Sequence, residues 1–312
     1  MTSEILIHVK ASPIRLAPDA SSEEAFIAII GGCLRHAEAN RLAVQQSQIE
    51  GVHQMRVAFR RLRSGLKIFR PLIPREASAS LVEDLRWLNG FLGPARDWDV
   101  FLEEGMAPVF AHFPRKRSLL LFRGRAGVLR EHHHQTLREA LAQPRYALMR
   151  QHFSDWLEGR AWREGLGDEA REPLAEPILA FATPLLESDH RRVVKRGEAF
   201  ADLSAEERHA LRIRIKELRY ALDFFASLYP APAVKITLSA LSGLQDCLGV
   251  MNDIAVARRL LDETGLKPLS VARQVIEGWY GCRLDVHERQ FAEVWQRYRE
   301  GERPWKDGGS GT

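Results

Sequence analysis

Cysteine is scarce in this sequence, and its few cysteines form no pattern. The 312 residues contain only Cys33, Cys247 and Cys282. An odd number of cysteines without metal-ligand spacing argues against a disulfide framework and against a zinc site, and it indicates a reducing compartment. We therefore interpret the three thiols as buried or incidental.

Long apolar runs are missing as well. No stretch approaches the roughly 18 apolar residues that a membrane-spanning helix needs. The first twenty residues, MTSEILIHVKASPIRLAPDA, lack the charged start and apolar run of a secretion signal. We expect a cytoplasmic protein with no membrane partner.

Convincing strand patterns do not occur. After Ser21, apolar residues recur at spacings of three and four, and prolines and glycines mostly fall between such segments. The sequence therefore predicts an all-α fold. The expected helices cover residues 22–48, 52–70, 77–92, 97–105, 116–142, 145–158, 174–197, 205–228, 233–249, 253–264, 269–284 and 286–300.

Acidic residues are absent from one basic stretch. The whole chain has 45 Lys and Arg against 41 Asp and Glu, yet residues 51–75 contain seven Arg and Lys and no acid. A solvated helix face normally mixes both signs, because like charges one turn apart repel one another. The stretch therefore favours a surface that an external anion neutralises, over the alternative of a plain solvated face.

The cations of this stretch share one side of its predicted helix. Their spacings of three and four place them within an arc of about 80°, in a stripe about 21 Å long. We call this set the first stripe, and its members are His53, Arg56, Arg60, Arg63 and Lys67. Val52, Phe59, Leu62, Leu66 and Phe69 form the adjacent apolar face, which we expect to be buried.

An internal repeat doubles this feature. A shift of 156 residues aligns residues 53–100 with residues 209–256 without a gap, and 15 of the 48 aligned positions are identical. The repeat predicts two four-helix-bundle-like halves related by a pseudo-two-fold axis. We expect an N-terminal extension (1–21), a first half (22–160), a second half (173–300) and a flexible tail (301–312).

The second copy of the stripe is weaker than the first. Its cations, the second stripe, are His209, Arg212, Lys216 and Arg219. Glu217 and Asp223 replace Arg61 and Lys67 of the first copy. We interpret the second stripe as partly self-neutralised, so that the first carries more of the binding.

A linear row of cations suits a linear polyanion. Arginine makes two-pronged contacts with phosphate oxygens, and lysine adds a mobile charge. If the two long helices meet across the pseudo-two-fold axis, the stripes line one basic channel. Single-stranded nucleic acid is a weaker alternative, because its sites usually combine the cations with aromatic stacking platforms.

These motifs resemble a known family. The paired helices HQMRVAFRR and HALRIRIKE, each followed by LGPARD or LGVMND, are similar to the CHAD family, the conserved histidine α-helical domain. The resemblance implies an all-helical fold around a basic central pore that binds inorganic polyphosphate, without catalysis or cofactor, and that targets proteins to polyphosphate granules. It also implies that the residues of both stripes face the ligand. No E-x-E-x-K signature of a CYTH domain occurs, so the chain resembles a stand-alone member.

Two other functions remain open from the sequence. One is a phosphohydrolase or phosphotransferase acting on polyphosphate or nucleotides, although the metal-binding carboxylate cluster that such chemistry usually needs is not evident. The other is a single-stranded nucleic-acid-binding protein that uses the same channel.

Four further features are open to interpretation. Arg191 and Lys195 share a helix face and are candidate additional basic contacts. The run His132, His133 and His134 is interpreted as solvated or capping rather than as a metal site, because consecutive residues on a helix point 100° apart. Asp97 and Asp253 are expected to cap helices or to hold a stripe arginine, and Gly93 and Gly249 to end the preceding helices.

Overall fold

The computed structural model describes residues 8–306, with Met251 described by its backbone only. Within that range the chain is helical, and the one β-type pairing is an isolated bridge between Ser21 and Pro177. The all-α prediction is confirmed. The α-helices are α1 (Ser22–Ala39), α2 (Arg41–Gln45), α3 (Ile49–Ile68), α4 (Ala79–Val100), α5 (Ala107–His112), α6 (Arg117–Ala142), α7 (Pro144–Glu158), α8 (Asp168–Ala175), α9 (Ile178–Gly197), α10 (Ala205–Phe224), α11 (Ala231–Glu263) and α12 (Val271–Glu300).

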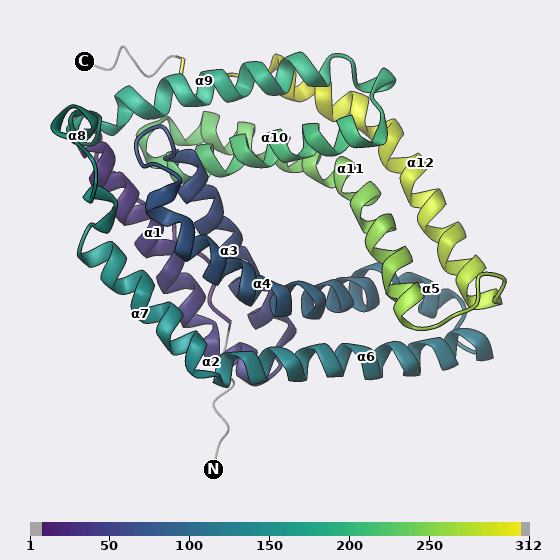
Figure 1. Cartoon of the computed structure of the whole chain (residues 1–312). Helices are drawn as coiled ribbons and strands as arrows, with labels where there is room; N and C mark the ends of the chain where they lie inside the picture. The colour runs from purple at the N-terminus through teal and green to yellow at the C-terminus, as the bar shows by residue number, and fades with distance from the viewer. Residues whose placement is uncertain (1–7, 307–312) are drawn as a thin grey trace.

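The helices run around the sides of an irregular frame (Figure 1). In that view α9 and α10 lie along the top and α6 along the bottom. Helices α1, α3 and α7 lie on the left, and α11 and α12 on the right. Helices α3 and α10, which carry the two stripes, pack against one another.

Three of the expected helix breaks do not occur. Helix α4 continues through Gly93, α11 continues through Gly249, and α12 continues through Asp285. The predicted helix ends at these glycines are therefore wrong, and Asp97 and Asp253 lie inside helices rather than at N-caps. At Gly93 the glycine serves packing instead, because a Cβ atom there would lie 3.0 Å from Nη1 of Arg56.

Two hydrophobic cores hold the frame together, and each contains residues from both halves of the chain. The larger core includes Phe26, Leu62 and Leu85 of the first half with Leu218 and Leu244 of the second. The smaller core joins the end of α4, α5 and the start of α6 to α11 and α12. Its buried members are Trp98, Phe101, Leu102, Met106, Val109, Leu119, Phe122, Ala126, Ala257, Leu260, Leu261, Ala272, Ile276 and Tyr280.

Up to residue 306, the chain beyond α12 packs against α9 instead of forming the flexible tail that we predicted. Trp305 is 2% exposed, and its indole N–H donates a hydrogen bond to Oε2 of Glu187 on α9 at 3.0 Å. Arg303 pairs with the same carboxylate at 3.2 Å. Burial of a large aromatic side chain fixes this segment, while residues 307–312 lie outside the described range.

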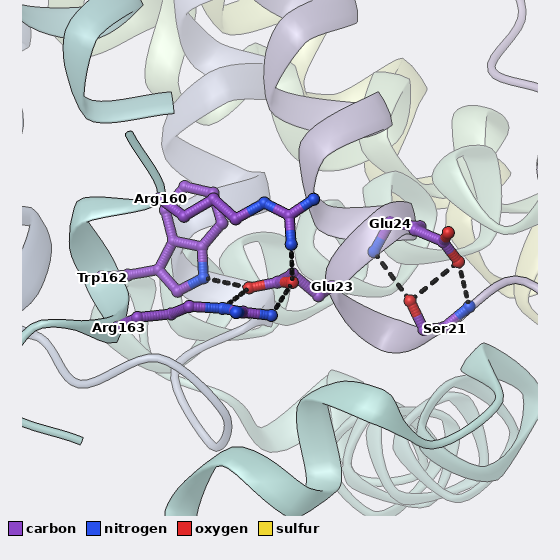
Figure 2. Close-up of polar contacts among 6 residues, drawn as sticks. All are labelled: Ser21, Glu23, Glu24, Arg160, Trp162 and Arg163. Atoms are coloured by element: carbon purple, nitrogen blue, oxygen red, sulfur yellow. Dashed lines mark hydrogen bonds and ion pairs between the residues drawn. The ribbon is translucent and has the colours of Figure 1, made fainter. Parts of the chain in front are cut away.

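A buried carboxylate joins the start of α1 to the segment after α7 (Figure 2). Glu23 accepts two hydrogen bonds from Arg163, at 2.7 and 2.5 Å. It accepts two more, from Arg160 and from the indole of Trp162, both at 3.0 Å. We call these four residues the clasp. Next to them, Ser21 and Glu24 form the capping box that begins α1.

No helix within residues 8–306 is both long enough and apolar enough to cross a membrane. Of the three cysteines, Cys33 and Cys247 are buried and Cys282 is exposed.

Candidate functional site

The first stripe lies on a single helix whose other face is fixed in the core. Val52, Leu62 and Phe69 are 0% exposed. Their burial fixes the orientation of α3 about its own axis. His53, Arg56 and Arg60 are half-buried, whereas Arg63 and Lys67 are exposed. The predicted apolar face is thus confirmed, and it turns the stripe away from the core.

Helices α3 and α10 are bridged by two ion pairs. Arg61 pairs with Asp223, and Lys67 pairs with Glu217. A shift of 156 residues relates Arg61 to Glu217 and Lys67 to Asp223. The two acids therefore do not neutralise their own stripe, as we had interpreted them, but hold the first helix against the second. Of the first stripe, Lys67 already has a carboxylate partner.

The two stripes meet around Lys216. Burial, together with the charges of Arg60, Arg212 and Arg56, lowers the pKa of the Lys216 ammonium to about 8. A lysine pKa falls when the charged form is desolvated and surrounded by like charges. Lys216 therefore marks the place where cations of both halves converge.

A tyrosine lies between arginines of the two stripes. The guanidinium carbon of Arg219 is 4.7 Å from the ring centroid of Tyr220, and that of Arg60 is 5.8 Å from it. Tyr220 is only 3% exposed. Its ring therefore supports both guanidinium groups through cation–π contacts, and it offers no open face for stacking a base.

Four of the five residues of the first stripe, all except His53, line a cleft of about 680 Å³ between α3, α4 and α10. We call it the basic cleft, since eight of its lining residues are cations and two, Glu83 and Glu217, are acids. The cations are Arg56, Arg60, Arg63, Lys67, Arg70, Arg75, Arg86 and Lys216. Sequence reasoning missed three of them. Arg70 and Arg75 belong to the acid-free stretch, but Arg86 lies on α4 and only the fold brings it to the cleft.

Most stripe cations in the centre have no acidic partner. Five of them have no carboxylate oxygen within 4.0 Å among the residues that the structure describes, namely Arg60, Arg63, Arg212, Lys216 and Arg219. The buried Nε atoms of Arg60, Arg212 and Arg219 also lack a hydrogen-bond partner. Buried donors without acceptors are unfavourable, so these three guanidinium groups keep hydrogen-bonding capacity that the described residues do not use.

A smaller cavity of about 230 Å³ adjoins the basic cleft and shares Arg56 and Arg60 with it. Its lining mixes charges, because His53, Arg96 and Arg283 face Asp97, Glu104 and Asp253. The residues named in its lining come from α3, α4, α11 and α12 and from the turn Phe101–Gly105. The smaller cavity is therefore less suited to a polyanion than the basic cleft.

Asp97 holds an arginine of the first stripe in place, which is one of the two roles that we expected for it. Its carboxylate lies 3.5 Å from Nη2 of Arg56 and accepts a hydrogen bond from Arg259 at 2.8 Å. Burial raises the pKa of Asp97 above its ordinary value, although both arginines oppose the shift. Asp253 lines the same cavity, and burial raises its pKa as well.

His53 lines the smaller cavity at the start of the stripe. Burial and the charge of Arg96 lower the pKa of its imidazole below the ordinary value of 6.5. In the free protein His53 is therefore mainly neutral at pH 7. Phosphate charges beside the ring would oppose these effects in a ligand-bound protein.

Five predicted contacts line neither cavity. Two of them, Arg212 and Arg219, still lie close enough to Lys216 for their charges to lower its pKa, whereas the other three lie away from the basic cleft. His209 is exposed near the start of α10 and lines neither cavity. Arg191 and Lys195 are exposed on α9, where Arg191 lies 3.6 Å from Glu187. The structure does not bring these three residues to the cations of the basic cleft.

The consecutive histidines have separate structural contacts. His134 is buried and lies 2.9 Å from Asp99, whereas His133 lies 2.6 Å from Glu263 on α11. His132 is exposed. The expectation of solvated or capping side chains is therefore wrong for His133 and His134, because each joins α6 to another helix through a different carboxylate.

Comparisons with known proteins identify the family of this chain and its fold. A family model described as CHAD domain matches residues 28–262. The chain is similar to the crystal structure of the CHAD domain from the plant Ricinus communis, with a TM-score of 0.80 and 31% identity over 96% of this chain and 98% of that chain.

A second solved structure, PptA from Streptomyces chartreusis, has a TM-score of 0.63 and 14% identity over 89% of this chain and 100% of that chain. At that identity the likeness shows the fold alone. No curated protein matches the sequence. The family match covers most of the residues, and the similarity to the plant domain extends over nearly the whole chain, so this chain belongs to the CHAD domain family.

Proposed function

We propose that the protein binds inorganic polyphosphate in the basic cleft, without catalysis. The observation that carries the proposal is the group of central cations that have no carboxylate partner among the described residues. Arginine and lysine are the residues that bind phosphate oxygens best, and the family is associated with polyphosphate. A chain of phosphates supplies many charges in a row, which matches a stripe of about 21 Å.

The cleft supports polyphosphate better than single-stranded nucleic acid. Its one aromatic lining residue is Tyr220, whose ring is buried beside Arg60 and Arg219. Nucleic-acid grooves usually expose aromatic faces on which bases stack. A ligand of phosphates alone needs no such platform.

The absence of catalysis is part of the proposal. Phosphoryl transfer usually depends on carboxylates that hold metal ions against the phosphates. Glu217, one of the two acids in the cleft lining, already pairs with Lys67 and Arg214. Incubating the protein with polyphosphate, magnesium and manganese should release no phosphate. Turnover that disappears on replacing His53 or Asp97 would favour an enzyme instead.

Titration with long-chain polyphosphate at two salt concentrations tests binding directly. We expect tight binding that weakens steeply as salt rises, because phosphate contacts release counterions. Competition with single-stranded DNA should favour polyphosphate. Binding that is insensitive to salt, or that prefers DNA, would contradict the proposal. In cells, the same binding would place a fluorescently tagged protein on polyphosphate granules, which microscopy can test.

A further inference from the structure

A second acid-free stretch lies at the opposite side of the molecule from α10. Residues 106–130 contain six Arg and Lys and no Asp or Glu. Five of the six are exposed, and none of these five has a carboxylate oxygen within 4.0 Å among residues 8–306. They are Arg115, Lys116, Arg117, Arg123 and Arg125. This charge belongs to neither stripe, and the basic cleft does not use it.

Exposed apolar side chains lie among these cations. Leu120, Leu121 and Val128 on α6 are 50%, 67% and 71% exposed. With Gly124 they form what we call the α6 crest, an arc of about 100° on the outer face of the helix. Arg123 and Arg125 fall on either side of that arc. The helix thus presents an apolar ridge with one arginine on each side and with Arg117 at its N-terminal end.

The inner face of α6 fixes this orientation. Leu119, Phe122 and Ala126 are at most 2% exposed and belong to the smaller core. The crest therefore cannot turn inward without emptying that core. The loop between α11 and α12 lies next to it, since a Cβ atom on Gly265 would lie 3.9 Å from Nη1 of Arg125. That loop adds Leu269, which is 85% exposed.

A second copy of the chain is a poor occupant for this face. A two-fold contact would place the arginines beside the crest against the same arginines of the other copy, and like charges across an interface are unfavourable. A peptide helix is also a poor occupant, because such helices dock into grooves. None of the crest residues lines either cavity of the candidate site.

An anionic bilayer fits both features. Interfacial helices place apolar side chains at the boundary between headgroups and acyl chains, and their cations contact anionic headgroups. A fluid surface accepts a convex ridge without a matching groove. The crest and its cations occupy the first half of α6, which runs along one edge of the frame, so this half can lie against such a surface (Figure 1). The exposed Glu131 and Glu139 lie on the second half of the helix.

We propose that the outer face of α6 is a peripheral membrane-binding surface for anionic phospholipid. The α6 crest enters the headgroup boundary, and the five exposed cations contact lipid phosphates and carboxylates. Binding is reversible and weakens with salt, because few side chains insert and most of the attraction is electrostatic. This surface is separate from the basic cleft and does not depend on the proposed function.

Vesicle flotation tests the proposal with the full-length protein. It should float with vesicles of phosphatidylcholine and phosphatidylserine, should not float with phosphatidylcholine alone, and should be released by high salt. Replacing both Leu121 and Val128 with Glu should lower the partition coefficient at least about tenfold, and replacing Arg117 with Ser about fivefold. Circular dichroism checks that each variant keeps its helix content.

Two control variants sharpen the result. Leu148 on α7 is 69% exposed, so Leu148→Glu makes the same chemical change at equal exposure on another face and should leave flotation unchanged. A variant with Arg60→Glu and Arg63→Glu should lose polyphosphate but still float. The proposal is overturned if the wild-type protein ignores phosphatidylserine at low salt, or if the crest variant floats like the wild type. It is also overturned if only the cleft variant loses flotation, or if the wild type is a dimer that the crest variant disrupts.

Discussion

The clasp and the basic cleft are both rich in arginine, but their arginines have opposite surroundings. In the clasp, one buried carboxylate receives four hydrogen bonds, from Arg160, Arg163 and the indole of Trp162 (Figure 2). In the cleft region, Arg60 and Arg63 have no carboxylate oxygen within 4.0 Å among the described residues. Arginine therefore has a carboxylate partner in the clasp and none at these two positions of the cleft region.

This difference separates arginines that stabilise the fold from arginines that are left available to an external ligand. The clasp needs no ligand, because both oxygens of its buried carboxylate accept hydrogen bonds and its two arginines remain partly exposed to water. The cleft region holds its cations close enough together that the pKa of Lys216 falls to about 8. That repulsion is a standing penalty, which a bound polyanion would remove.

Reversing charge in the cleft should have the largest effect on binding. We expect a variant with Arg56→Glu, Arg60→Glu and Arg63→Glu to bind polyphosphate at least about a hundredfold more weakly. The slope of log K against log salt should lose about 2, at about 0.7 per phosphate contact. Titration at several salt concentrations measures both quantities.

The matched control makes the same charge change on α9. Arg191, Lys195 and Arg196 are exposed there and line neither cavity. Their replacement with Glu should change the affinity much less. Equal losses in the two triple variants would show that overall charge, rather than the cleft, governs binding.

Removing the charge of the clasp should change stability instead of binding. Glu23→Gln leaves Arg160 and Arg163 without their carboxylate, and we expect a loss of about 2 kcal/mol in the free energy of unfolding. The partial exposure of both arginines limits the loss, because water can solvate them. Urea unfolding measures it, with Glu169→Gln on α8 as an exposed control.

The clasp also has a defined pH dependence. Burial tends to raise the pKa of Glu23, but hydrogen bonds from Arg163 and Trp162 outweigh it and bring the pKa below the ordinary value of 4.5. Its stabilisation is therefore fully present above pH 4.5 and is lost as the pH falls through the lowered pKa. Glu23→Gln should remove this part of the acid sensitivity, and polyphosphate affinity at neutral pH should not change.

How much of this could be predicted from the sequence depends on the range of each interaction. The first stripe and its buried apolar neighbours follow from helical periodicity, which is local, so the structure reproduces that face. Helices α3 and α10, which the repeat relates to one another, pack together in the structure. The predicted helix ends at Gly93 and Gly249 failed because glycine is only a weak local signal, and packing along α4 and α11 overrides it.

The partners of individual charges could not be read from one helix. From the sequence, Glu217 and Asp223 looked like lost cations of the second stripe, yet they pair with residues 150 and 162 positions away. Arg86 reaches the cleft from α4, and no spacing in the sequence relates it to α3. His209 matches His53 in the repeat but lies outside both cavities, since the repeat preserves residue type and not surroundings.

The lowered pKa of Lys216 predicts how binding should respond to alkaline pH. Near pH 7 the amine is already protonated, so this group adds no pH dependence there. Above about pH 8 it is deprotonated in the free protein, while phosphates should raise its pKa in the complex. Binding then takes up a proton, and affinity should fall by up to about tenfold per pH unit between pH 8 and 10.

Lys216→Arg provides the control for this effect. Arginine stays protonated throughout that range, so the variant should bind with a flatter pH profile and with similar affinity at pH 7. Isothermal titration calorimetry in buffers of different ionisation enthalpy measures the proton uptake directly. An unchanged slope in the arginine variant would assign the pH effect to another group.

We expect the smallest effect from replacing Glu217, an acid of the cleft whose position differs from that of Glu23 in the clasp. Glu217 lines the cleft and neutralises Lys67 and Arg214, whereas Glu23 in the clasp lies away from any ligand. Glu217→Gln should free both cations for phosphate and strengthen polyphosphate binding about fivefold, with the gain largest at low salt. Glu83→Gln is the matched change, because Glu83 lines the same cleft and has no Arg or Lys nitrogen within 4.0 Å among residues 8–306. A gain from Glu217→Gln that exceeds the gain from Glu83→Gln would show that Lys67 and Arg214 take part, whereas equal gains would reflect only the lost negative charge.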